Sequence, residues 1–83
     1  MGDVIVVFRI MPASPEDFEQ MKADMEKLNP KRLEEEPIAF GLKALKFTTI
    51  IPDKEGEIGK LEDKLKAVQN VKSIQTIMVS RSL

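Results

Sequence analysis

The sequence predicts an α+β fold of the ferredoxin-like type, a split β-α-β sandwich with the element order β-α-β-β-α-β. Three observations lead to this prediction. Two stretches of similar length carry apolar side chains at the helical spacing i, i+3, i+7 and i+10. Each of them follows a stretch that is apolar and β-branched. These two strand candidates are the most apolar in the chain, which suits the centre of an antiparallel four-stranded sheet with two helices on one face.

The first strand is expected over residues 3–11, DVIVVFRIM. Its apolar face at period two consists of Val4, Val6, Phe8 and Ile10. We expect Pro12 to end the strand, because proline donates no ladder hydrogen bond. A helix is expected next, with Ser14 as its N-cap and Pro15 at its first position. The apolar stripe of this helix consists of Phe18, Met21, Met25 and Leu28.

Residues 31–36, KRLEEE, are poor strand formers, but they are placed to form a short, charged edge strand. The next strong strand alternates one set, Leu45, Phe47, Thr49 and Ile51, with a second set, Ala44, Lys46, Thr48 and Ile50. A second helix is expected over residues 57–68, with the stripe Ile58, Leu61, Leu65 and Val68. Residues 71–83 should form the last strand. Its facing is ambiguous, because Ile74 and Met78 fall on one side while Ile77 and Val79 fall on the other.

The composition narrows the possible functions. At 83 residues the chain predicts one domain, residues 1–83. Its 13 basic and 14 acidic residues give a net charge of -1, which argues against a nucleic-acid binder and against electrostatic docking to a membrane. The chain has no cysteine and no histidine, which removes disulfides, thiolate metal sites and imidazole catalysis. No apolar run approaches a membrane span. We therefore expect a cytoplasmic protein that is not an enzyme and uses no cofactor or metal.

The segment EEEPIAFGLKAL, residues 34–45, is the main candidate binding feature. We expect Pro37 to break strand pairing, so that the chain leaves the ladder there. Gly41 permits a positive φ, which leaves Ile38 and Phe40 as apolar side chains on a short loop. Phe40 either folds back to cap the core or stands out as an anchor for a partner, and the pattern alone does not choose. The three glutamates before the proline are interpreted as a solvated edge.

Three stretches carry a family resemblance: MGDVIVVFRIMP, EEPIAFGLKAL and VKSIQTIMVSRSL. They resemble the archaeal translation elongation factor 1-beta family, and the resemblance covers the whole chain. It implies a guanine nucleotide exchange factor with a ferredoxin-like fold. It also implies that the partner is elongation factor 1-alpha, the GTPase that delivers aminoacyl-tRNA to the ribosome.

The resemblance also implies a set of partner-binding residues. The hairpin would contact the GTPase through four residues: Pro37, Ile38, Phe40 and Gly41. In the eukaryotic domain, a lysine next to the C-terminus is held to disrupt the partner's magnesium site. Here the chain ends in SRSL, so the resemblance carries that role to Arg81, with Leu83 at the chain end. Arginine is not a free replacement for lysine, because it presents a planar fork instead of a point charge.

The predicted topology separates these two candidate contacts. The hairpin between the second and third strands lies at one pole of the sheet, and the last strand runs away from that pole. Phe40 and Arg81 should therefore not enter one pocket, because a strand of five or six residues is about 17–20 Å long. A partner that binds both must contact both ends of the protein. We expect the free protein to be a monomer.

Two other functions stay open on the residues alone. One is a small-molecule-binding regulatory domain of the same fold that acts as a dimer, with its ligand on the outer sheet face around Arg9 and Lys46. The other is an RNA-binding accessory protein. The near-neutral charge disfavours the second function, and so does the placement of Phe8 and Phe47 on core-facing stripes instead of a stacking platform.

Overall fold

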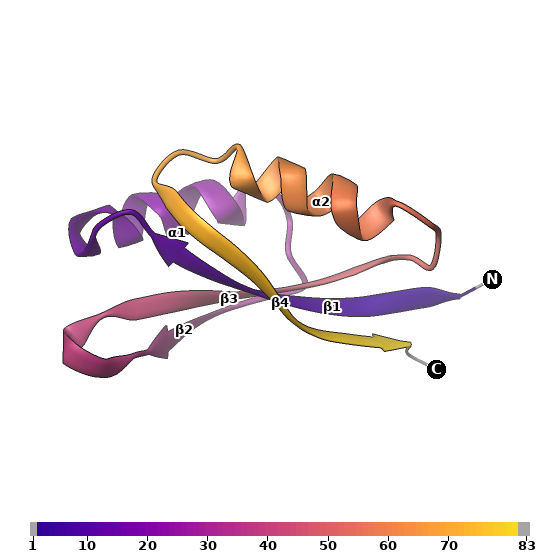
Figure 1. Cartoon of the computed structure of the whole chain (residues 1–83), viewed down its shortest axis with the longest axis horizontal. Coiled ribbons are helices and arrows are strands. Elements are labelled where there is room, and N and C mark those ends of the chain that lie inside the picture. Colours follow the sequence, from indigo (N-terminus) through magenta and orange to yellow (C-terminus); the bar gives the residue numbers. More distant parts are fainter. Residues whose placement is uncertain (1, 82–83) are drawn as a thin grey trace.

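The computed structural model describes residues 2–81 as one antiparallel four-stranded sheet with two α-helices on one of its faces (Figure 1). The elements in chain order are β1 (Asp3–Pro12), α1 (Phe18–Glu26), β2 (Arg32–Pro37), β3 (Lys43–Pro52), α2 (Glu57–Lys66) and β4 (Val71–Arg81). Two short 3-10 turns are η1 (Pro15–Asp17), before α1, and η2 (Ala39–Gly41), between β2 and β3. The strand order β2-β3-β1-β4 places the two most apolar strands at the centre. The predicted ferredoxin-like fold is confirmed.

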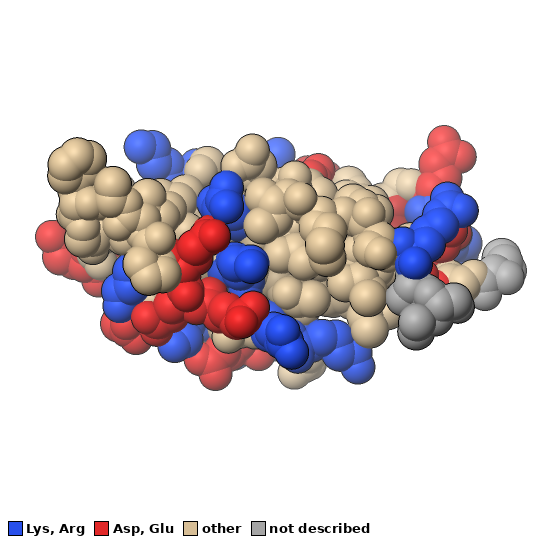
Figure 2. All heavy atoms as spheres, turned by 90° about the horizontal axis from the view of Figure 1, so that it is seen from below, with Lys and Arg blue, Asp and Glu red and all other residues tan. Residues whose placement is uncertain are grey.

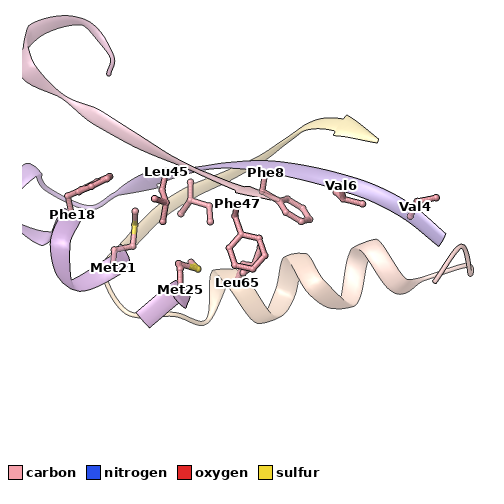
Figure 3. Packing of buried hydrophobic residues seen from close by; sticks show 10 residues of the cluster. Val4, Val6, Phe8, Phe18, Met21, Met25, Leu45, Phe47 and Leu65 are labelled. Atoms are coloured by element: carbon pink, nitrogen blue, oxygen red, sulfur yellow. The ribbon is translucent and has the colours of Figure 1, made fainter. Parts of the chain in front are cut away.

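The hydrophobic core lies between the sheet and the two helices (Figure 3). At its centre Phe8 of β1 is opposite Phe47 of β3, and the two rings meet edge to face with centroids 6.4 Å apart. The predicted stripes of both helices face this pair. Their members are fully or partly buried: Phe18, Met21, Met25, Leu28, Ile58, Leu61, Leu65 and Val68. Period-two and helical spacing therefore placed the core correctly, because every one of these positions follows from the geometry of a regular element.

The first helical segment begins after Ser14 with Pro15 at its first position, as the sequence predicts, but its first turn is a 3-10 turn. Ser14 is extended and precedes the 3-10 turn, whereas the α-helix begins at Phe18. The Ser14 hydroxyl donates to Asp17 Oδ2 at 2.9 Å instead of accepting a backbone N–H, so it makes no side-chain cap. The reason is the carboxylate of Asp17, which offers a stronger acceptor than water and draws the hydroxyl toward itself. Among residues 2–81, no helix is long and apolar enough to span a bilayer.

A β-bulge in β4 resolves the ambiguous facing of that strand. Val7 is opposite Met78 and Phe8 is opposite Thr76, so Ile77 is the extra residue. Directly opposite residues in antiparallel strands point to the same face. Thr76 therefore lies on the helix side with Phe8, and its hydroxyl donates to Glu62 Oε2 of α2 at 2.7 Å. Beyond the bulge, Met78 lies on the outer face with Val7.

The paired aromatic rings give the first test of the core. Phe47→Ala should lower the free energy of unfolding by about 3–5 kcal/mol, because its ring is buried against Phe8. The same substitution at Phe40, whose side chain is 98% exposed, should change it by no more than about 0.5 kcal/mol. Urea denaturation followed by circular dichroism measures both values. Equal losses at the two positions would contradict this placement of the core.

Candidate functional site

The hairpin between β2 and β3 is paired closer to its tip than the sequence predicts. Pro37 remains in the ladder opposite Lys43, and the N–H of Ile38 donates to the carbonyl of Leu42 at 2.7 Å. The prediction that Pro37 breaks the pairing is therefore wrong. The physical reason is that β2 is an edge strand, where a proline is tolerated because its missing N–H can face away from the neighbouring strand. The loop is reduced to the three residues of η2.

Phe40 stands at the tip of this short loop. Its backbone is left-handed, with φ 63° and ψ 33°, and Gly41 follows with φ 75°. The side chain is 98% exposed, so the reading of Phe40 as a core cap is wrong. A positive φ is uncommon for a residue with a side chain and is strained for a bulky one. Gly41 has the positive φ that the sequence predicts, and it carries no such strain because it lacks a Cβ.

The base of the loop is also apolar. Ile38 and Leu42 are 37% and 38% exposed. A small cavity of about 150 Å³ lies beside Gly41 and Leu42, next to the segment that joins β1 to α1. The exposed ring of Phe40 does not line this cavity. The hairpin therefore presents an apolar base and a free aromatic tip to the solvent.

Two of the three glutamates before the loop hold the hairpin in place. Glu35 Oε2 accepts a hydrogen bond from Lys22 Nζ of α1 at 2.8 Å, and Glu35 Oε1 accepts one from Lys43 Nζ at 3.2 Å. On the opposite side of the strand, Glu36 accepts two hydrogen bonds from Arg9 of β1, at 2.8 Å and 3.3 Å. The run does form an edge strand, as the sequence predicts, and Glu35 remains exposed. What the sequence interpretation lacked is that Glu35 and Glu36 are both held in ion pairs.

The alternation of a strand contains a signal that could have revealed these pairs. Adjacent residues in a strand point to opposite faces, so Glu35 and Glu36 cannot share one environment. Glu35 faces the helix layer, where Lys43 Nζ lies 5.0 Å from the centre of the Phe18 ring. Glu36 faces outward, opposite Ala44, which is small and completely buried. A small residue on β3 leaves room for the ion pair that joins β2 to β1.

These ion pairs lower the pKa of both carboxyl groups. The hydrogen bond from Lys22, with a second one from Lys43, lowers the pKa of Glu35 below its usual value of 4.5. The hydrogen bond from Arg9 lowers the pKa of Glu36 in the same direction. Each carboxylate is stabilised in its charged form in the folded protein, so both pairs are present at neutral pH.

The strand β4 ends at Arg81, and this end of β4 lies at the opposite end of the molecule from the hairpin between β2 and β3 (Figure 1). Arg81 is the last described residue and is opposite Val4, near the start of β1. Its guanidinium Nε is 3.4 Å from Asp53 Oδ2, in the loop after β3, and its side chain is 81% exposed. Leu83, the other predicted C-terminal contact, lies outside the described residues. The structure thus brings Pro37, Ile38, Phe40 and Gly41 together and separates them from Arg81.

The outer face of the sheet holds a shallow groove that sequence reasoning left undefined. Its volume is about 450 Å³, and it is lined by charged residues of β2 and β3 together with Val7, Ile77 and Met78. This groove lies on the face where the sequence prediction places the ligand of the alternative small-molecule regulatory domain. Within residues 2–81 there is no cluster of three or more His, Cys, Asp or Glu side chains that could hold a metal ion.

Comparison with known proteins identifies the class of this chain. A family model described as the EF-1 guanine nucleotide exchange domain matches residues 5–81. The chain therefore belongs to the EF-1 guanine nucleotide exchange domain family. A domain of this family implies a GTPase as its partner, since guanine nucleotide exchange takes place on such a protein.

Curated relatives narrow the resemblance to one kind of protein. Elongation factor 1-beta of Methanoregula boonei is 45% identical over 83 residues, covering 96% of this chain and 98% of its own length. Elongation factor 1-beta of Thermoplasma acidophilum is 38% identical over 86 residues, with coverages of 96% and 98%. The same factor of Methanothermobacter thermautotrophicus is 36% identical over 87 residues and is covered to 98%, as is this chain. The resemblance to the archaeal elongation factor 1-beta family is confirmed.

The backbone of Phe40 can be tested apart from its ring. Phe40→Asn should raise the free energy of unfolding by roughly 1 kcal/mol, because asparagine tolerates the left-handed conformation and an exposed ring contributes no burial. Chemical denaturation of the two proteins under the same conditions measures the difference. A clear loss of stability would show that the ring contributes contacts to the fold.

The glutamate pairs predict a pH dependence. A carboxyl group whose pKa is lowered by folding stabilises the protein above its unfolded-state pKa of 4.5, and this contribution disappears as the pH falls through the lower folded-state value. Glu36→Gln should therefore be less stable than the parent protein above about pH 5, and the difference should vanish at lower pH. Thermal melts between pH 2 and pH 7 give the comparison. Glu34→Gln is the control, since Glu34 forms no salt bridge with any residue from 2 to 81.

Proposed function

We propose that this protein is the guanine nucleotide exchange factor for elongation factor 1-alpha and that it acts in the cytoplasm during translation elongation. The observation that carries the proposal is the exposed aromatic tip of the hairpin, in a chain that matches the exchange family over residues 5–81. A fully exposed Phe40 has no role in the core, and aromatic side chains are frequent anchors of protein interfaces.

The proposed mechanism needs no covalent chemistry. An exchange factor promotes GDP release because it binds the nucleotide-free GTPase more tightly than the loaded one. To turn a ratio of 1:99 into 99:1, the preference must be about 10⁴-fold, or about 5.5 kcal/mol. By linkage, the nucleotide must expel the factor as strongly as the factor expels the nucleotide. The factor and the nucleotide therefore compete reversibly for binding to the GTPase. The factor needs no bound cofactor for this.

The two ends of the molecule have different parts in this proposal. The hairpin grips one region of the GTPase through Phe40, with Pro37, Ile38 and Gly41 around it. The end of β4 presents Arg81 to a second region, where a cation would loosen the magnesium ion that holds the nucleotide. The molecule is 41 Å along its longest axis, so the two contacts fall on separate regions of the partner. Leu83, two residues further along the chain, would add to the second contact.

Arg81 can leave its ion pair with Asp53 with little loss of free energy. Its pair with Asp53 is long, at 3.4 Å, and its side chain is mostly exposed. Exposed ion pairs of this kind are weak because water and salt screen them. Acidic magnesium ligands on a GTPase would offer the guanidinium a less hydrated and therefore stronger partner. In this proposal the free protein is a monomer whose C-terminal cation is held loosely until the GTPase arrives.

Release of labelled GDP from purified elongation factor 1-alpha tests the proposal. The parent protein should accelerate release, and Phe40→Ala and Arg81→Ala should each reduce this acceleration by about tenfold or more. Lys60→Ala, at an exposed position of α2, removes a positive charge from the helix side and should behave as the parent does.

The outcomes separate two questions. If the parent protein leaves GDP release unchanged, the exchange function itself is wrong. If the parent accelerates release and both Phe40→Ala and Arg81→Ala match it, exchange stands and the contact at two ends is wrong. If one variant alone loses activity, the contact lies at that end.

A further inference from the structure

The outer face of the sheet carries an apolar patch that the proposed contacts at the two ends do not use. It spans three strands, because Ile5 is opposite Ile50 of β3 and Val7 is opposite Met78 of β4. We call these four residues the outer apolar patch. Ile50 and Met78 are 41% and 46% exposed, while Val7 is buried beneath its neighbours. Figure 2, which views this face, shows a broad uncharged area beside a band of charged side chains.

The two helices offer no comparable surface. Among the described residues, the large apolar side chains that are strongly exposed belong to the hairpin, β3 and β4, and none belongs to α1 or α2. The exposed positions of α2 are mostly charged, as in Lys60, Asp63 and Lys64. A partner that follows one long side of the molecule would therefore meet polar helices on one face and the outer apolar patch on the other.

The charged band beside the patch is largely neutralised by its own members. Arg9 and Glu36 form a two-point ion pair, and Glu34 lies opposite Lys46 in register, without a salt bridge between them. A surface on which opposite charges lie next to one another presents little net field to an approaching protein. On the far side of the band, Ile38 and Leu42 extend exposed apolar surface toward the hairpin tip. At its other end the patch reaches Ser80, which is opposite Ile5 and next to Arg81.

Along the outer face, the apolar surface of the patch and that of the hairpin base are therefore separated only by this band. We propose that the outer apolar patch is a docking surface for the GTPase itself, which would lie along the outer face of the sheet from the hairpin to the end of β4. This inference rests on the proposed function, because a single partner that reaches both ends must pass along one side of a 41 Å molecule. The patch supplies affinity without taking part in the loss of magnesium.

Neighbouring residues of β4 provide a matched pair of variants. Met78 is on the outer face and 46% exposed, whereas Val79 is opposite Val6, on the helix side, and 51% exposed. Met78→Lys and Val79→Lys therefore add the same charge at similar exposure on opposite faces. Ile50→Lys places the charge in the patch from β3 and serves as the second patch variant should Met78→Lys fold poorly.

The experiment measures the acceleration of GDP release from elongation factor 1-alpha over a range of factor concentrations, with the melting temperature of each variant as a folding check. Met78→Lys and Ile50→Lys should raise the concentration of factor needed for half-maximal acceleration by about tenfold, while the maximal rate stays near the parental one. Val79→Lys should stay within about twofold of the parent. The half-maximal concentration should change and the maximal rate should not, because the patch contributes to binding while the contacts of Phe40 and Arg81 are unchanged in these variants.

Three results would overturn the inference. The first is a parent that accelerates release while Met78→Lys and Ile50→Lys match Val79→Lys at every concentration. The second is a parental dimer, seen by sedimentation at the assay concentration, that Met78→Lys dissociates without loss of exchange, since a second copy would then occupy the patch. The third is a parent that does not accelerate release, which removes the proposed function and this inference together. The rate of GDP release with the parent protein distinguishes this third result from the first.

Discussion

The edge-to-face contact between Phe8 and Phe47 is the interaction on which the other parts of the structure depend. It joins the two central strands and forms the centre of the surface onto which α1 and α2 pack. A chain of 83 residues has too little apolar surface for two such layers, so the whole core lies on one side of the sheet. The other face is left to solvent or to a partner, and the features that distinguish this protein are found there and at the two ends.

The hairpin is held in one arrangement by several contacts, which would favour the contact proposed for Phe40. The ladder continues to Pro37, the Ile38–Leu42 hydrogen bond closes the loop, and the loop itself has three residues. Glu35 ties the hairpin to α1 through Lys22, and Glu36 ties it to β1 through Arg9. The aromatic tip is thus presented on a base that has few conformations to lose. Binding through a pre-ordered loop is stronger because less conformational entropy is lost on association.

The sequence was sufficient for features that repeat along a regular element and insufficient for those that depend on contacts between elements. Period two and helical spacing predicted the core side chains and both helix stripes, and the predicted topology together with apolar composition placed the first and third strands at the centre of the sheet. The ion pairs of Glu35 and Glu36 were missed because their partners, Lys22 and Arg9, lie on other elements. Pro37 was misread although its strand was predicted to lie at the edge of the sheet. The sequence did not fix the hairpin register, which decides whether the missing N–H of Pro37 faces away from β3. For Phe40, the sequence showed the candidate and could not show its exposure.

Two properties of β4 decide where Arg81 lies: the length of the strand and the β-bulge at Ile77. The number of residues in β4 decides how far along the sheet Arg81 lies, at about 3.3 Å per residue. The bulge decides which face each later side chain takes, because one extra residue reverses every direction after it. Adding residues in pairs would lengthen the end and keep its direction, whereas a single addition or loss upstream would turn Arg81 to the other face. Among chains that share this core, the distance of Arg81 along the sheet and the face to which it points can therefore vary independently.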